Sequence, residues 1–276
     1  KRELILGLFT FAAFMVLYIF TNFKTAAGTM MGLCGYTAAY LSQKGFSFLV
    51  FIPAAIIVGV LFASINGILI TKFKVPAMVA TLAMVNVHLG IFILLPHGGW
   101  VENLQSNFTM IGKTSFFAAI PLVFVLSLVL TAILLWFMKY SRFSKKIYAV
   151  GGNSEAAILS GIQPEKVIMQ TYILEGILIG IASVLFYTPK SIVQANSTHG
   201  MEMLFITATV VGGTNIAGGE GRVTGTIIGV ILVALINRSM IFLGLQDYYS
   251  FAVQGAIILI AVLTTAVDRG KLKKKL

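Results

Sequence analysis

Charged residues are scarce in this 276-residue sequence, and their scarcity excludes an ordinary soluble domain. Asp, Glu, Lys and Arg make up only 11% of the chain, hydrophobic residues make up 58%, and the mean hydropathy is +0.95. Soluble domains carry about 25% charged residues. The composition therefore predicts an integral membrane protein.

Cysteine and histidine are scarce as well. The single cysteine, Cys34, excludes an internal disulfide framework and a cysteine-based metal cluster, and we expect it to pack between helices as a small residue. The three histidines form no HExxH motif and the sequence has no GxSxG, which disfavours an intramembrane hydrolase. It also lacks the phosphate-binding patterns GxxxxGKS and GxxxxGKT. We therefore expect no catalytic residue, no metal site and no cofactor in this chain.

Long stretches with one charged residue or none divide the chain into candidate membrane helices. Most of them reach the ~20 residues that a helix needs to cross a bilayer. The expected crossings are residues 4–20, 28–41, 47–70, 75–95, 114–138, 167–188, 202–211, 223–244 and 248–267. The sequence thus predicts an all-α, polytopic membrane protein with about nine crossings, built as one domain over residues 1–276.

The basic residues predict which loops face the cytoplasm. The formal net charge is +11, and the basic residues gather at the ends of the apolar stretches and in the tail 269–275. Anionic lipid and the positive-inside rule explain this distribution without nucleic acid. Lys72, Lys74, the loop 139–166 and the C-terminus are therefore expected on the cytoplasmic side.

Successive membrane crossings must alternate in direction, and at the N-terminus this alternation conflicts with the positive-inside rule. If the path is followed back from a cytoplasmic C-terminus, Lys1 and Arg2 fall outside, against the same rule. We therefore expect one crossing to be missing near residues 23–28, whether deleted or absent from the sequence for another reason. An N-terminus with external basic residues is the alternative.

The longest polar interruption, residues 139–166, contains the segment GGNSEAAILSGI at 151–162. Asn153 or Ser154 can cap a helix, and Glu155 favours the positive N-terminal end of that helix. Gly161 supplies a left-handed stop, followed by Pro164. The short helix between them has an apolar surface and no membrane to bury it. It either packs on its own bundle or docks into a groove of a cytoplasmic partner.

A second motif, GGTNIAGGEGR at 212–222, has five glycines in eleven residues. Such a segment allows tight backbone paths. Irregular backbone at membrane depth is tolerated only where it is buried in protein or lines water. The segment is either a tight cytoplasmic turn or part of a translocation path.

Polar residues inside the apolar stretches are candidates for a solute pathway. Such residues usually face the interior of the bundle or a cavity. We select Asn86, His88, Asn237 and Gln254, with interhelical hydrogen bonding as the alternative reading of the amides. Glu175 lies near the middle of its stretch, where it is protonated, paired or water-facing. Trp100 is expected to anchor the chain at the outer interface, with contact to an external partner as the alternative.

Several of these segments together resemble a known family. They are Asn66-Gly67, VPAMVATL at 75–82, GGNSEAAILSGI at 151–162, VVGGTNIAGGEGRVTGT at 210–226, and residues 237–244 followed by Tyr248-Tyr249. In this order they resemble the permease subunits of bacterial ATP-binding-cassette (ABC) importers for simple sugars, the ribose, galactose and autoinducer-2 group. The resemblance runs from about residue 28 to 267.

The resemblance implies a fold and a set of partners. The family has the type II importer architecture, with about ten helices per subunit and two permease subunits around a central path in the bacterial plasma membrane. A substrate-binding protein delivers the solute from outside, and two cytoplasmic ATPase subunits bind ATP and Mg. By the same resemblance, those ATPases grip Gly151, Gly152, Asn153, Ser154, Glu155, Ala156, Ala157, Leu159, Gly161 and Ile162.

The sequence departs from the family in two places. A GIDLSVG-like segment that normally precedes residues 28–41 is absent, which agrees with the crossing missing by the charge rule. Glu175 stands where the family usually has a small or neutral residue. A branched-chain amino acid or nucleoside permease, and an ion-coupled secondary transporter that uses Glu175, are the alternatives. The sequence leaves open which solute is carried and whether the two permease subunits are identical.

Overall fold

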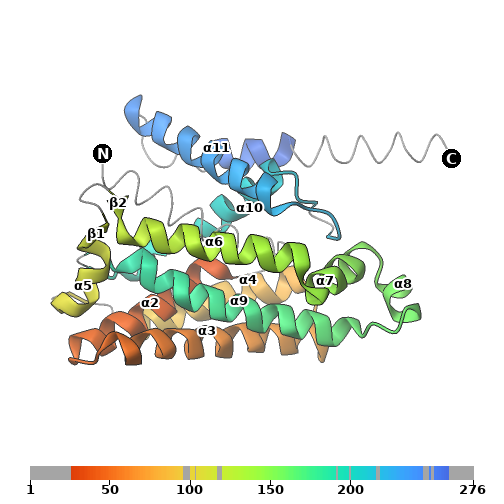
Figure 1. The fold of residues 1–276 in the computed structure, drawn as a ribbon, viewed down its shortest axis with the longest axis horizontal. Helices are drawn as coiled ribbons and strands as arrows, with labels where there is room; N and C mark the ends of the chain where they lie inside the picture. Colours follow the sequence, from red (N-terminus) through yellow and green to blue (C-terminus); the bar gives the residue numbers. More distant parts are fainter. Residues whose placement is uncertain are drawn as a thin grey trace.

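The computed structural model describes residues 26–95, 100–102, 104–116, 120–190, 192–198, 200–215, 218–244, 249 and 252–260. This part of the chain is a helical bundle with one very short hairpin (Figure 1). The elements in chain order are α2 (Ala27–Gln43), α3 (Phe48–Thr71), α4 (Ala77–Leu94), α5 (Ser106–Lys113), β1 (Ser115–Phe116), β2 (Ile120–Pro121), α6 (Leu122–Tyr140), α7 (Arg142–Gly152), α8 (Ser154–Leu159), α9 (Pro164–Tyr187), η1 (Ala195–Thr198), α10 (Met201–Val211) and α11 (Val223–Phe242). The predicted helical class of fold is confirmed.

Five helices in the described part of the chain are long and apolar enough to cross a membrane, namely α3, α4, α6, α9 and α11. Two more expected crossings are shorter: α2 has 17 residues and α10 has 11. The last expected crossing, 248–267, is described as helix only at residue 249 and over 252–260. The first, 4–20, and residues 23–25 of the proposed gap at 23–28 lie outside the described residues, so the count of nine stays a prediction.

The centre of the bundle is the pair α3 and α9, which lie side by side (Figure 1). Ala55, Gly59, Ala63 and Gly67 recur every four residues along α3, so they form one stripe that is buried. Gly59 and Gly176 face each other so closely that a Cβ on either would meet the backbone of the other. Lipid is as apolar as leucine, so such helices associate through close backbone contact. The four-residue spacing of these small residues is visible in the sequence, although it was not used to predict this helix pair.

Helix α2 packs on both helices of this pair and also contacts α4. Its glycines admit large rings, because Gly32 touches Phe92 and Gly35 touches Tyr187. Cys34 is fully buried, and its Sγ would lie 3.4 Å from a Cβ on Gly59. The expectation that Cys34 packs between helices is confirmed.

The start of α2 is fixed by a residue far along the chain. Glu202, in the first turn of α10, accepts a hydrogen bond at Oε1 from the backbone N–H of Thr29 at 3.0 Å. A carboxylate there satisfies one of the free N–H groups of the first helical turn and suits the positive end of the helix. Glu202 therefore joins the N-terminal ends of α2 and α10.

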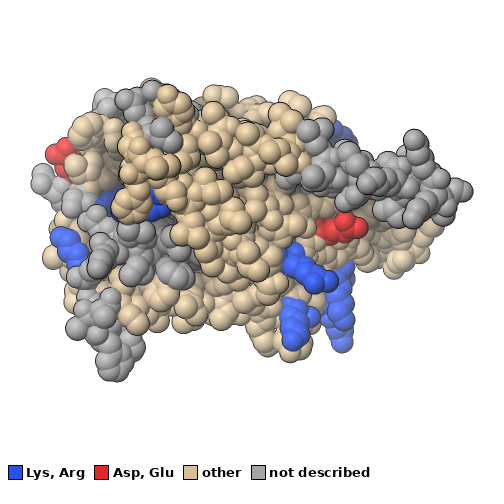
Figure 2. Space-filling view, turned by 90° about the horizontal axis from the view of Figure 1, so that it is seen from above, with Lys and Arg blue, Asp and Glu red and all other residues tan. Residues whose placement is uncertain are grey.

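The loops gather at two opposite ends of the bundle (Figure 1). One end carries α5 and the β1–β2 hairpin; there Val101 pairs with Val193, and Gln43 Nε2 donates to the Glu102 carbonyl oxygen at 3.1 Å. The other end carries α7, α8 and residues 218–222. Charged side chains form two groups separated by a broad uncharged band in the view of Figure 2. This is the distribution that a membrane-spanning bundle requires.

Candidate functional site

Loop 139–166 forms a compact unit at one end of the bundle. After α6 the chain enters α7, whose N-cap Ser141 accepts from the Phe143 N–H at 3.0 Å. Helix α7 ends at Gly152, and a single extended residue, Asn153, separates it from α8. Gly151 and Gly152 therefore belong to α7, and the later residues of the segment form α8 and the turn after it. Sequence reasoning used the basic residues of α7 only as a marker of sidedness and missed the helix.

The caps of α8 agree with the sequence. Asn153 is the N-cap, because its Oδ1 accepts from the Ala156 N–H at 3.0 Å, and Glu155 stands in the first turn. Gly161 has a positive φ of 78° and its N–H donates to the Ile158 carbonyl. Pro164 is the first residue of α9. The prediction of a short helix capped in this way is confirmed.

The apolar surface of α8 faces away from the bundle. Leu159 is 90% exposed and Ile158 is 57% exposed, whereas Ala157 is buried. Both exposed residues lie outside the five long apolar helices. An apolar tip at this end of the molecule therefore has no cover from the described part of the chain. Of the two readings of this helix, packing on its own bundle is disfavoured for this surface.

The structure brings the two glycine-rich motifs together, which the sequence did not predict. Tyr148 of α7 donates from its hydroxyl to the Gly221 carbonyl oxygen at 3.1 Å. A Cβ on Gly151 would lie 2.6 Å from the Gly219 nitrogen, so the two backbones touch. Burial raises the pKa of Tyr148, which keeps its hydroxyl protonated as the donor.

The described residues of the segment 212–222, namely 212–215 and 218–222, belong to a tight turn held by its own hydrogen bonds. The Asn215 N–H donates to the Glu220 carbonyl at 2.9 Å, and Asn215 Nδ2 donates to Glu220 Oε2 at 3.2 Å. Gly213, Gly218 and Gly219 have positive φ, which explains why this path requires glycine. Gly212 packs directly on Gly225 at the start of α11. Of the two readings of this motif, the described geometry favours the tight turn.

A third contact ties the α3–α4 turn to the same end. Lys74 Nζ forms a salt bridge with Glu165 Oε1 at 3.0 Å. Lys74 has a φ of 55°, a left-handed conformation that is uncommon for a residue other than glycine. Lys74, loop 139–166 and residues 218–222 thus share one end. For Lys74 and loop 139–166, the positive-inside rule predicted a shared side.

The four candidate pathway residues do not form one cluster. Asn86 is exposed on α4 and donates to the Leu82 carbonyl at 3.2 Å. His88 on the same helix is fully buried, edge-on to Phe62 with ring centroids 4.9 Å apart. Asn237 is half-buried on α11, and Gln254 is buried in the helical residues 252–260. Helix α4 packs on α2, α3 and η1, whereas α11 packs on α10 and α6. A shared pathway role stays a prediction.

Two acidic residues are buried in the bundle. Glu175 is 3% exposed within α9, and Glu202 caps α2. Sequence reasoning treated Glu202 only as the start of a crossing, although a carboxylate two residues after Gly200 and before an apolar run signals a helix start. Within the described residues, no three His, Cys, Asp or Glu side chains come together as a metal site.

The chain is similar in sequence to a family of transport proteins and to known import permeases. Residues 4–262 match the family described as "Branched-chain amino acid transport system / permease component". The ribose import permease protein of Bacillus subtilis (strain 168) is 36% identical over 209 residues, which cover 75% of this chain and 63% of that protein. The ribose import permease protein of Escherichia coli (strain K12) is 32% identical over 258 residues, or 90% of this chain and 79% of that protein.

A third relative has another solute in its name. The autoinducer 2 import system permease protein of Yersinia pseudotuberculosis serotype O:3 (strain YPIII) is 27% identical over 238 residues, which cover 86% of this chain and 68% of that protein. No solved structure matches the chain. The aligned part spans less than two thirds of the Bacillus relative.

Proposed function

The chain belongs to the family of branched-chain amino acid transport system permease components, and on that premise we propose that it is the membrane-spanning subunit of an ABC importer for a simple sugar. The import permease relatives for ribose and autoinducer 2 support a sugar-like solute. The subunit itself is non-catalytic, sits in the bacterial plasma membrane and keeps its C-terminus in the cytoplasm. It pairs with a second permease subunit and receives the solute from an extracytoplasmic binding protein.

The observation that carries the proposal is the exposed tip of α8. A capped helix with Leu159 90% exposed, held between two long apolar helices, suits a groove on a cytoplasmic ATPase. Burying a leucine side chain is worth about 1.5–3 kcal/mol. ATP and Mg bind to that partner, and Gly151 to Ile162 of this chain supply the grip. The partner must bind the two conformations of the importer with different affinity, because only such a difference shifts their populations.

The contacts of loop 139–166 give a route by which movement of α8 reaches the bundle. Tyr148 and Gly151 hold the turn 212–222, which leads into α10 and α11. Glu165 holds Lys74, which lies between α3 and α4. A displacement of α8 at the cytoplasmic end would therefore be transmitted to two pairs of helices, α10 with α11 and α3 with α4. Asn86, His88, Asn237 and Gln254 would contribute neutral polar groups where these helices separate.

A pair of aspartate variants tests the docking role. Leu159→Asp places a charge in the proposed groove, and Leu243→Asp places one on a comparably exposed leucine, 75% exposed, at the end of α11. When the chain is co-expressed with an ABC ATPase and a binding protein, we expect Leu159→Asp to abolish co-purification of the ATPase and ATP-dependent uptake of D-ribose. Leu243→Asp should retain both. Equal co-purification and uptake in the two variants would contradict the docking assignment.

Reconstitution separates this function from ion-coupled transport. We expect vesicles that contain this chain alone, with a proton or sodium gradient, to accumulate no D-ribose. Accumulation that disappears in Glu175→Gln would instead establish a secondary transporter. The same vesicles with the ATPase, ATP and the binding protein should accumulate the sugar, and a branched-chain amino acid or nucleoside offered in its place identifies the other permease classes.

A further inference from the structure

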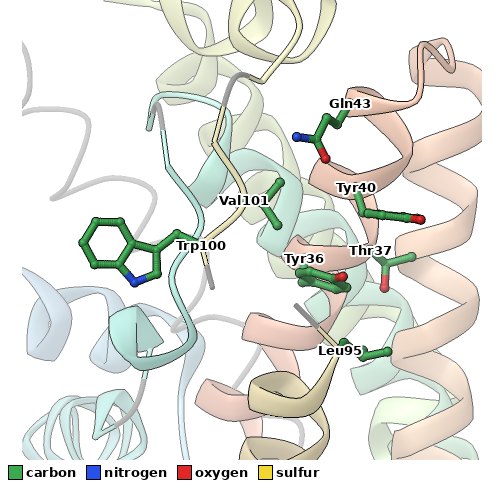
Figure 3. A pocket seen from close by; sticks show the side chains of 7 residues that line it. All are labelled: Tyr36, Thr37, Tyr40, Gln43, Leu95, Trp100 and Val101. Atoms are coloured by element: carbon green, nitrogen blue, oxygen red, sulfur yellow. The ribbon is translucent and has the colours of Figure 1, made fainter. Parts of the chain in front are cut away.

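A pocket with a volume of about 550 Å³ opens at the end of the bundle opposite α8. Seven side chains line it, as Figure 3 shows: Tyr36, Thr37, Tyr40, Gln43, Leu95, Trp100 and Val101. None of these described residues is charged. The proposed coupling mechanism does not use this pocket.

One wall of the pocket is a face of α2. Tyr36, Tyr40 and Gln43 follow the spacing i, i+4, i+7, so their side chains project from the same side of the helix. The opposite wall, with Trp100 and Val101, is fixed by two backbone hydrogen bonds of 3.0 Å between Val101 and Val193. Gln43 Nε2 ties α2 to that wall through the Glu102 carbonyl. The pocket is therefore preformed, as small-molecule sites usually are.

Two aromatic rings of the pocket, Tyr40 and Trp100, are partly exposed, and Lys44 Nζ lies 5.6 Å from the centre of the Tyr40 ring. Tyr36 and Tyr40 are stacked, with ring centroids 5.9 Å apart and 18° between their planes. Tyr40 is 42% exposed and Trp100 is 56% exposed. The faces of aromatic rings carry partial negative charge. They attract the weakly positive C–H groups on the apolar face of a sugar ring.

The polar groups in the pocket suit hydroxyls. Because Gln43 donates through Nε2 to the opposite wall, its Oε1 stays directed to the side of Tyr40 (Figure 3). Thr37 Oγ1 donates to the Leu33 carbonyl at 2.9 Å and thus presents its lone pairs as an acceptor. The seven lining side chains are uncharged, and their acceptors, with the Lys44 ammonium over the Tyr40 ring, suit the hydroxyls of a neutral polyol. We propose that this pocket binds a neutral sugar at the extracytoplasmic mouth of the importer. The inference rests on the proposed function, which places this end outside the cell and makes a sugar the solute.

The two tryptophans of the chain allow a direct binding test. Trp136 lies on α6, away from the pocket, and Trp136→Phe leaves Trp100 as the only indole. We expect D-ribose, D-galactose or D-xylose, titrated into the full chain in lipid nanodiscs, to change Trp100 fluorescence with saturation in the millimolar range. Adding Tyr40→Ala should weaken the apparent affinity at least about tenfold, and Tyr40→Phe, which keeps the ring, should weaken it less. Phe242→Ala, which removes an exposed ring on α11, is the matched control.

The outcomes separate this site from the proposed function. A linear response to all three sugars that is the same in the Tyr40→Ala and Phe242→Ala backgrounds would overturn the pocket assignment. Saturation that follows added anionic lipid instead of sugar would also overturn it and would identify a headgroup site. In either case ATP-dependent uptake by the assembled importer would still support the proposed function. Sugar binding by the chain without any uptake by the assembled importer would leave the pocket standing and refute the importer.

Discussion

The hydroxyl of Tyr148 donates to the carbonyl oxygen of Gly221 at 3.1 Å and so joins two segments that are 73 residues apart. Tyr148 belongs to α7, directly before α8, the helix proposed to dock on an ATPase, and Gly221 belongs to the turn before α11. The bond therefore connects α7 and α8, which the proposed ATPase would displace, with the turn between α10 and α11.

Loss of this bond should loosen the link without unfolding the protein. Tyr148→Phe removes one hydrogen bond, worth about 0.5–1.5 kcal/mol. We expect ATP-dependent uptake to fall a few-fold while ATP hydrolysis by the assembled importer continues, so that fewer solutes are carried per ATP. Tyr140→Phe, on a tyrosine that is 63% exposed, should change the ratio less. An unchanged ratio in Tyr148→Phe would contradict the route through Gly221.

Two neighbouring glycines at the end of α7 offer a sharper comparison. A Cβ on Gly151 would press on Gly219, whereas a Cβ on Gly152 would meet nothing within 4 Å. Gly151→Ala should therefore push the turn 212–222 away. Uptake should fall by about fivefold or more, because fivefold corresponds to the low end of typical coupling free energies between two sites. Gly152→Ala adds its methyl group without that backbone clash, so uptake should fall less than in Gly151→Ala. Equal uptake by both variants would show that the backbone contact does not transmit movement.

The packing of α3 on α9 predicts opposite signs for two other glycines. Gly59 touches the backbone of Gly176, so Gly59→Ala must separate the helices and should cost about 1–3 kcal/mol. A methyl group added at Gly90 on α4 would meet no atom within 4 Å, and Gly90→Ala should stabilise its helix by up to about 1 kcal/mol. Thermal unfolding in detergent measures both. A melting temperature that falls equally in the two variants would argue against close α3–α9 contact.

Lys190, just after α9, predicts a pH dependence of stability. Its Nζ lies 3.5 Å from the centre of the Phe186 ring, and burial lowers its pKa from 10.5 to about 8. Below about pH 8 both states hold the proton, and the folded state carries the full cost of burying the charge. Between about pH 8 and 10.5 the unfolded chain holds more protons, so the free energy of unfolding rises with pH.

Replacing this lysine should remove the rise. We expect Lys190→Met to flatten the increase in melting temperature between pH 7.5 and pH 9.5, an interval of roughly two pH units that covers most of this window. Lys72→Met removes an exposed lysine and should keep the parental slope. If the slopes of the parent and Lys190→Met coincide, the buried ammonium is not its source.

The prediction of α8 succeeded because its determinants are local. Asn153, Glu155, Gly161 and Pro164 act on backbone groups within a few residues, so their types and spacing specify where the helix starts and stops. The cap was found where it was expected. Helix α7 was missed because its amphipathic pattern is short and was read only for its charge.

The four candidate pathway residues illustrate the limit of such reasoning. Polarity inside an apolar stretch marks Asn86 and His88 as unusual, but the side to which each residue points depends on neighbouring helices. One is exposed and the other is buried against Phe62, although both lie on α4. Their separation by two positions turns them to different faces of the helix.

By itself the sequence determined the membrane class, the long apolar helices, the shared end of the basic loops and the capped helix α8, because hydropathy, charge and caps act along the chain. Only the tertiary structure decided that Glu202 caps α2, that the turn 212–222 rests on α7, and that Tyr36, Tyr40 and Trp100 border one pocket. Those relationships join residues that are distant in sequence, and they depend on how closely helix backbones approach. The distance between two helix backbones is smallest where glycines from both helices face each other, as Gly59 and Gly176 do. It therefore depends on both helices together.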